Sequence, residues 1–521
     1  MKKRHMVKRC TGLFLAFALA ASLICATDLT ALAASDAAAA SETVVAASET
    51  DETVTLSGGE TITEGGSYCL AEDASGVITI STTDKVEISG NGAEYGEDLQ
   101  MTSTPNAGLF FSATVAGINL TLSDMFISDT SADVPLLDLT GEGNVLTIEG
   151  TVVLDMDTGY NLNAAIHVGP DASLTVNGSG TLYLYKNTQG AGFGGNSGEM
   201  NGTITFSDST SSLKVFAKGT KQGALIGAGA NASSSDDDPG SVSFVEGAYN
   251  LISNSRGAVI GGSAGSRASG GTTVYVGTKA NININVDYSG AAVGGGGYDG
   301  GNDSSGGTLY VSGGSLRCYI DQNAAGNTTG WNGNAYTAGV NDAAITAQRL
   351  NAAGEAVYWS AFDTTLLGEE AASAETFKVY VDGNLFYEGG LPEYGFVQEG
   401  LDKGEQLSIT STASNWYKNG ETNLYFYLTG ENHSVTVNDK AFTCIWDSES
   451  ESFSYYEGAA STYDVTGNFE NVTSSGSGTA WDVVDYTATL TADEDYLLPD
   501  SITVTVGGSE LVSGEGYVYD A

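Results

Sequence analysis

The sequence has little positive charge, few prolines, few cysteines and few histidines. Only 19 of its 521 residues are Lys or Arg, against 64 Asp or Glu, and the net charge at pH 7 is −45. Nucleic acids and anionic lipids are bound through Lys and Arg, so the composition argues against both kinds of partner. The same charge is compatible with solubility outside the cell, with divalent cations and with neutral glycans.

The five cysteines have no zinc-binding spacing, and Cys10 and Cys25 lie in the N-terminal segment. The three that remain are far apart and odd in number, so we expect no disulfide framework. Cys318 alternates with Leu316 and Ile320, which predicts an inward, buried thiol.

Long hydrophobic runs are confined to the N-terminus. A basic segment precedes an apolar run from Leu13 to Cys25 and a small-residue stretch that ends at Ala34. This pattern predicts a secretory signal peptide over residues 1–34. After this segment the sequence has no run of about 18 apolar residues, the length needed to span a membrane. The mature chain is therefore expected to be secreted or held at the cell surface.

Glycine is abundant, with 70 residues, and much of it lies in a short motif that occurs four times between Gly190 and Ile320. The motif has the form Ala-x-Ile-Gly-Gly, and its apolar third residue is Phe193, Ile226, Ile260 or Val293. These four positions are about 33 residues apart, a period typical of solenoid proteins.

Each glycine motif is followed by two alternating runs, for example Ser241–Val245 and Tyr249–Ile252, so we predict three short strands per repeat. The repeats are rich in Gly, Ser, Thr, Val and Asn, which excludes helical repeats of similar period. Such units bury their apolar side chains only by stacking. The expected fold is a right-handed parallel β-helix, with Ile226, Ile260 and Val293 in a ladder at a spacing of about 4.8 Å. Anchors at Leu109, Leu136 and Ile166 extend the ladder towards the N-terminus.

The whole chain is predicted to be all-β. We divide it into a signal peptide (1–34), a disordered spacer (35–53), the parallel β-helix (54–342), a compact β-rich module (343–458) and a partial β-sandwich repeat (459–521) that is either incomplete or a fragment. The module includes a hairpin, Phe377–Val381 with Leu385–Tyr387, joined by Asp382-Gly383-Asn384. Strands are expected at 486–490 and 502–506.

Three stretches resemble a known group of proteins. They are the repeated Ala-Val-Ile-Gly-Gly motif, the strand entry Gly270–Val276, and Tyr425–His433. All three are similar to segments of secreted Gram-positive bacterial proteins described as carbohydrate-binding or adhesin-like, with a glycine-rich β-helix like that of pectate lyases. The resemblance implies a β-helix and a surface role, but fold alone does not fix activity.

Several stretches match parts of enzymatic motifs but lack the context that the chemistry needs. Gly190-x-Gly-x-x-Gly195 and Gly261-x-Ser263-x-Gly265 match a dinucleotide fingerprint and a nucleophile elbow, but neither is followed by a helix. A polygalacturonase-type site needs Gly-His-Gly and Arg-x-Lys motifs, which the sequence lacks. A pectate-type lyase needs Ca²⁺ and an Arg or Lys base. The candidates for that base are Arg256, Arg267 and Arg317, for which a solvated turn or strand position is the simpler interpretation.

Two acidic loops follow glycine motifs at similar points of the repeat. Hard cations such as Ca²⁺ take six to eight oxygen ligands from flexible loops of this kind. We therefore predict a Ca²⁺ site, shared or separate, with a solvated acidic turn as the alternative, at Asp236, Asp237, Asp238, Asp299, Asn302 and Asp303.

The sequence as a whole favours a secreted, non-catalytic carbohydrate-binding or adhesin-like surface protein that uses Ca²⁺ and binds a polysaccharide or cell-surface glycan. An acidic-polysaccharide lyase and a structural surface spacer remain as alternatives.

Overall fold

The structure is a computed structural model. It describes residues 43–45, 53–93, 101, 103–129, 133–157, 161–206, 212–233, 240–264, 272–286, 290–296, 307–320, 348–391, 394–395, 406–407, 416–418, 422–468, 470–476, 478–506, 508–515 and 517–519. The chain divides into two units, residues 1–42 and 43–521, and all described residues lie in the second.

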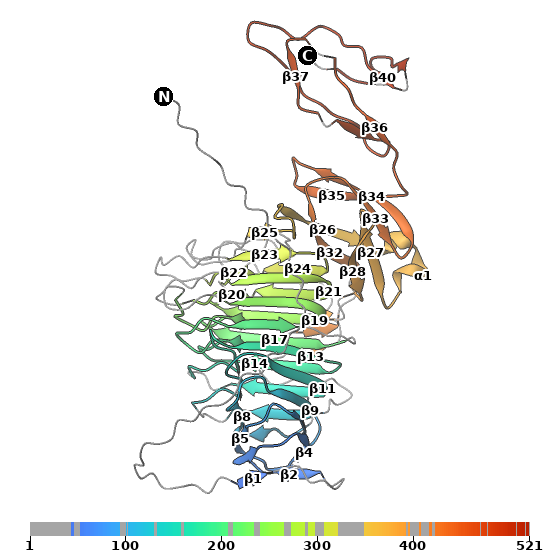
Figure 1. Ribbon diagram of the computed structural model, residues 1–521. Coiled ribbons are helices and arrows are strands. Elements are labelled where there is room, and N and C mark those ends of the chain that lie inside the picture. Colours follow the sequence, from blue (N-terminus) through green and yellow to red (C-terminus); the bar gives the residue numbers. More distant parts are fainter. Residues whose placement is uncertain are drawn as a thin grey trace, which may run out of the picture. The chain divides into compact units, whose positions relative to one another are not determined.

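Two parallel sheets make up the N-terminal two thirds of the described chain (Figure 1). In the described residues, the short-strand sheet has the order β1 (Thr43–Val45), β3 (Glu60–Ile62), β5 (Gly76–Ile80), β8 (Leu109–Ala113), β10 (Leu137–Asp138), β12 (Ile166–His167), β15 (Phe193–Gly194), β18 (Ile226–Gly227), β20 (Ile260–Gly261) and β22 (Val293–Gly294).

The long-strand sheet has the order β2 (Val54–Leu56), β4 (Gly66–Leu70), β6 (Lys85–Ser89), β9 (Asn119–Ser128), β11 (Asn144–Met156), β13 (Ser173–Gly178), β16 (Thr203–Phe206), β19 (Ser241–Ser255), β21 (Thr273–Val286), β23 (Thr308–Val311) and β25 (Gln348–Leu350). Four more strands pair beside this path: β7 (Asn106–Ala107), β14 (Thr181–Lys186), β17 (Lys214–Lys221) and β24 (Ser315–Ile320).

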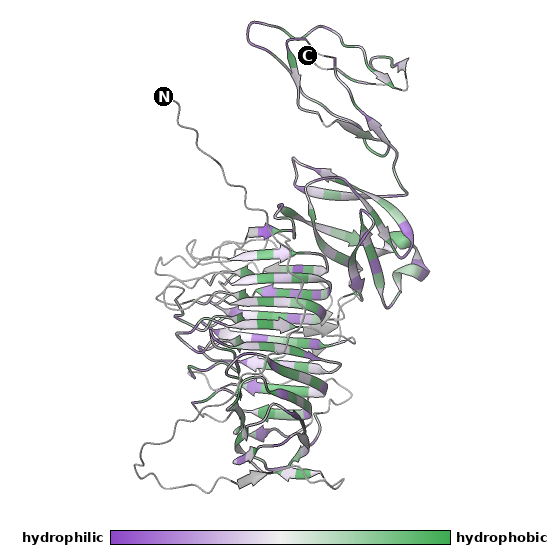
Figure 2. Cartoon of the chain, in the orientation of Figure 1, coloured by the Kyte–Doolittle hydropathy of each residue, from purple (hydrophilic) through white to green (hydrophobic). Residues whose placement is uncertain are grey.

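The chain visits the two sheets in turn, and we call one such visit to both sheets a coil. Strands of successive coils pair in parallel, as β18 does with β20 and β20 with β22. Apolar residues line up from coil to coil, which gives the stacked strands their continuous hydrophobic bands (Figure 2). The predictions of an all-β chain and of parallel strand stacking are confirmed.

The predicted ladder holds in the glycine-rich repeats. Ile260 pairs with Ile226 on one side and with Val293 on the other, and all three side chains are buried in one core cluster. Cys318 is a free, buried thiol in the same cluster, as predicted.

Two details of the repeat differ from the prediction. The ladder continues through Leu137 and Phe111 and not through Leu136 and Leu109. Because Leu136 and Leu137 are both fully buried, alternation alone could not decide between them. The second and third predicted strands also lie in one sheet, and in β19 they merge across a register shift after Phe244. At this point the strand forms a β-bulge and stays in the same sheet, so the repeat does not form a third sheet.

The second residue of each two-residue strand explains why the motif needs glycine. Gly194, Gly227, Gly261 and Gly294 have φ values between 128° and 140°. A Cβ atom on Gly194 would lie 1.9 Å from the carbonyl oxygen of Gly227 in the next coil. Any side chain at this position would be strained and would push the coils apart.

A second β region follows β25. Its five-stranded antiparallel sheet has the order β28 (Asn384–Gly389), β27 (Phe377–Val381), β33 (His433–Val437), β34 (Lys440–Asp447) and β35 (Ser452–Glu457). Beside it lie the pair β26 (Val357–Asp363) and β32 (Asn423–Thr429), a 3₁₀ helix (Thr364–Leu367) and α1 (Glu369–Ala372). A separate three-stranded sheet has the order β29 (Tyr394–Gly395), β31 (Trp416–Lys418) and β30 (Gln406–Leu407).

The predicted hairpin of this region is confirmed. Strands β27 and β28 pair antiparallel, and the turn residues Asp382 and Gly383 have φ values of 50° and 80°. Both lie in the left-handed region that a type I′ turn requires. None of the helices in the described ranges is long and apolar enough to cross a membrane.

The C-terminal segment forms three separate two-stranded ladders: β36 (Thr462–Asp464) with β38 (Thr479–Trp481), β37 (Val472–Ser474) with β39 (Leu490–Ala492), and β40 (Thr505–Val506) with β41 (Ser509–Glu510). The strands predicted over 486–490 and 502–506 are mostly wrong, since only residue 490 and residues 505–506 are in strands. Described side chains here are partly or fully exposed, so the alternating pattern has no opposing sheet to cover it.

Candidate functional site

The acidic residues predicted to bind Ca²⁺ all lie outside the described residues: Asp236, Asp237, Asp238, Asp299, Asn302 and Asp303. Within the described residues, no group of three or more His, Cys, Asp or Glu side chains is placed to hold a metal ion. The Ca²⁺ site therefore stays a prediction.

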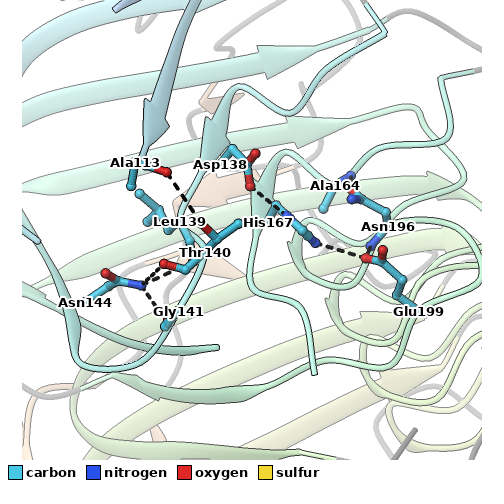
Figure 3. A network of polar contacts seen from close by, with 10 residues as sticks. All are labelled: Ala113, Asp138, Leu139, Thr140, Gly141, Asn144, Ala164, His167, Asn196 and Glu199. Atoms are coloured by element: carbon cyan, nitrogen blue, oxygen red, sulfur yellow. Dashed lines mark hydrogen bonds and ion pairs between the residues drawn. The ribbon is translucent and has the colours of Figure 1, made fainter. Parts of the chain in front are cut away.

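A partly buried histidine, His167, links three coils on the outer side of the short-strand sheet (Figure 3). In β12, Ile166 points into the core, so the alternation of the strand turns His167 outward. Its Nδ1 lies 2.8 Å from Oδ1 of Asp138 in β10, and its Nε2 lies 2.9 Å from Oε2 of Glu199. The backbone N–H of Asn196 also donates to Glu199 and fixes that carboxylate (3.0 Å).

Burial lowers the pKa of His167, but the hydrogen bonds and charges of the two carboxylates outweigh burial and raise it to about 9. The hydrogen bond from His167 in turn lowers the pKa of Glu199. At neutral pH the imidazole is therefore protonated, and both of its nitrogens are engaged. A group in this state is a poor general base. We interpret the Asp138–His167–Glu199 network as a cross-link between coils.

We expect this network to make stability depend on pH. Folding raises the pKa of His167. The protonated imidazole therefore adds its full share to the free energy of unfolding below about pH 6.5, and this share is lost as the pH rises through 9. A His167→Gln variant should be less stable than the wild type by on the order of 3 kcal/mol at pH 6, and the difference should shrink by pH 10.

Urea denaturation of both proteins at pH 6, 8 and 10 measures this difference. Thr205→Val, a non-titrating change in the same stack, should keep the wild-type pH dependence. A gap between His167→Gln and wild type that is the same at all three pH values would contradict a charged imidazole.

The sequence pattern alone gave no sign that His167 takes part in a polar network. Asp138 could have been found, since it holds the same ladder position one coil earlier. Glu199 could not, because it lies in a turn outside the periodic positions.

The outer side of the long-strand sheet carries a second candidate site. Five successive strands, β13, β16, β19, β21 and β23, begin with the pattern outward–inward–outward, and every inward residue is buried. All ten outward residues carry a hydroxyl group and none is charged. We call them the hydroxyl face: Ser173, Thr175, Thr203, Thr205, Ser241, Ser243, Thr273, Tyr275, Thr308 and Tyr310.

These residues form columns that run from coil to coil. Thr175 pairs with Thr205, Thr205 with Ser243, and Ser243 with Tyr275. Tyr275 pairs in turn with Tyr310. The column thus changes from small to large side chains between β19 and β21.

The two tyrosines are stacked, with ring centroids 5.2 Å apart and ring planes 11° from parallel. Tyr310 covers one face of the Tyr275 ring, but the register neighbour on the other side is the small Ser243. Tyr275 is accordingly 44% exposed. Among the described residues, the column therefore contains a step at which one face of the Tyr275 ring has only a serine as its register neighbour and is uncovered. This step could have been found from the sequence by aligning the alternating runs of the repeats.

No protein-family description matches the chain, and neither does any curated protein or any solved structure.

Two of the three arginines that were candidates for the base of a lyase lie in the described residues. Arg317 in β24 is buried, and its guanidinium carbon lies 4.4 Å from the centre of the Tyr425 ring. A base that abstracts a proton must reach its substrate, and this group is covered. Arg256 is partly buried in the segment after β19, and Arg267 lies outside the described residues.

Proposed function

We propose that this chain is a secreted, non-catalytic carbohydrate-binding or adhesin-like protein, and that its parallel coils form a right-handed β-helix. The observation that carries the proposal is the uncovered ring of Tyr275 in a face of uncharged hydroxyl groups. Aromatic rings supply apolar area at binding sites, and hydroxyl groups both donate and accept hydrogen bonds. Sugars present the same two features, C–H faces and hydroxyl edges.

Charge supports a neutral partner. The chain has a net charge of −45, yet the hydroxyl face carries neither acid nor base. A polyanionic glycan would be repelled by the chain as a whole and would find no cation on this face. An uncharged polysaccharide or cell-surface glycan meets neither obstacle.

The proposal predicts that Tyr275→Ala weakens glycan binding about tenfold, which corresponds to about 1.4 kcal/mol. The purified chain is run through native gels that contain β-glucan, xylan, mannan or polygalacturonate, and retardation is measured. Tyr463→Ala is the matched control, because Tyr463 is a tyrosine of similar exposure (50%) in the C-terminal segment.

Equal retardation of wild type and Tyr275→Ala would contradict the site, and no retardation in any gel would favour the spacer. Release of unsaturated products that absorb in the ultraviolet would favour the lyase. We also propose that binding uses Ca²⁺ at the acidic loops. The same gels run with EDTA test this, since unchanged retardation would contradict it.

A further inference from the structure

We propose that the glycan lies across the coils, parallel to β19, with one sugar ring stacked on the uncovered face of Tyr275 and its hydroxyl edge on Ser241 and Ser243. This inference rests on the proposed function and specifies how the same site selects its ligand.

The direction follows from the orientation of the tyrosine rings. The 5.2 Å separation of the nearly parallel rings of Tyr275 and Tyr310 is close to the strand spacing of about 4.8 Å. Both ring planes therefore lie across the stacking direction of the coils. A sugar that stacks on Tyr275 takes the same plane. Its glycosidic bonds leave from the edges of its ring, so the glycan continues along the strand and not from coil to coil.

Strand β19, which pairs with β21 on the uncovered side of Tyr275, supplies the residues that would contact the glycan. Ser241, Ser243 and Val245 are successive outward residues of β19, and Val245 is 46% exposed. Outward residues of one strand are about 6.6 Å apart, so the two serine hydroxyl groups can meet hydroxyl groups of one sugar or of two neighbouring sugars. Val245 offers apolar contact to the next ring.

A charged pair follows the outward residues Ser241, Ser243 and Val245 of β19. After the register shift, Oε1 of Glu246 lies 3.5 Å from Nζ of Lys279, so the cation at this end already has an acidic partner. An anionic sugar on β19 would meet serine hydroxyls and a paired lysine. The chemistry fits an uncharged glycan.

The sugar class follows from the stacking. An aromatic ring packs closely against a pyranose only where that face carries C–H groups without an axial hydroxyl. Hexoses whose hydroxyl groups are all equatorial present two such faces. Linear β-1,4-linked chains of these sugars are also flat and extended, so they can follow a strand. The inferred ligand is a neutral, β-linked glucan-type chain.

The decisive variant adds a side chain and removes no binding group. Ser243→Tyr would extend the Tyr275–Tyr310 stack by one coil and cover the free ring face. It changes an outward, partly exposed residue whose neighbour in the next coil already carries a tyrosine, so the coil should fold normally. Thr175→Tyr places the same ring in the same column two coils away and is the matched control.

Cellohexaose, a β-linked chain of six glucose units, is titrated into each full-length protein by calorimetry, after circular dichroism has shown that each is folded. We expect wild type and Thr175→Tyr to bind equally and Ser243→Tyr to bind at least tenfold more weakly. Unchanged binding by Ser243→Tyr would overturn the site. An equal loss of affinity in Thr175→Tyr would contradict a glycan that runs parallel to β19, because it would mean that the glycan runs from coil to coil.

Failures of the two proposals can be told apart. A wild-type chain retarded by none of the polysaccharides above would overturn the proposed function. A wild-type chain retarded only by polygalacturonate, with no heat on titration of cellohexaose, would keep carbohydrate binding and overturn the sugar class.

Discussion

Replacing Ile260 with aspartate is expected to unfold several coils. Ile260 is fully enclosed between Ile226 and Val293 in the ladder of the short-strand sheet. The substitution removes buried apolar surface and leaves a carboxylate in a core with no described cation beside it, a loss of more than about 4 kcal/mol. Because each coil is stabilised by its neighbours, the damage should spread to the coils on both sides.

Circular dichroism and urea denaturation of the purified variant measure this effect. Val245→Asp introduces the same charge at an exposed position of β19, the strand that precedes β20 in the chain. Its stability should stay close to that of the wild type. A folded Ile260→Asp protein of wild-type stability would contradict the stacked-coil core.

Replacing Lys186 with methionine is expected to cost about 3 kcal/mol of unfolding free energy, because three buried carbonyl groups lose their ammonium donor and two of them keep only a hydroxyl donor at 3.4 Å. Lys186 in β14 is completely buried, and it lies in register between Met156 and Gly219 of the adjacent coils. Its Nζ donates to the carbonyl oxygens of Gly223 (2.8 Å), Gly190 (2.9 Å) and Thr188 (3.3 Å).

Gly219 makes room for this arrangement. A Cβ atom on Gly219 would lie 3.0 Å from Cε of Lys186, so the missing side chain in the next coil lets the lysine extend toward Gly223. Burial lowers the pKa of Lys186 to about 7. The three carbonyl groups act in the opposite sense, because they bind the ammonium form. Lys186 therefore joins two coils through hydrogen bonds inside the core.

Urea denaturation at pH 6, where the amine is protonated, tests this role. Lys279→Met is the control, since its amine is exposed and pairs with Glu246 only at 3.5 Å. A Lys186→Met protein that is as stable as wild type would mean that the cost of burying the ammonium cancels the value of its hydrogen bonds.

The sequence by itself determined the features that depend on short-range pattern. Alternation and the recurrence of one glycine motif placed Ile226, Ile260 and Val293 in a buried ladder. The composition of the repeats excluded helices, and Asp382-Gly383 marked a tight hairpin. Each of these depends on a backbone preference or on strand alternation, which a few neighbouring residues settle.

Only the tertiary structure decided what lies beside each residue in the next coil. It chose Leu137 over Leu136 for the ladder, since both are apolar and the choice depends on how the preceding loop aligns the strands. It brought Glu199 to His167 from a turn that follows no period. It also set the exposed fraction of Tyr275 (44%) and the 5.2 Å stacking of its ring on Tyr310, which an alignment of the repeats does not give. Pattern within a strand fixes which way a side chain points, but loop lengths fix its neighbours in the adjacent coils, and these neighbours make the candidate site.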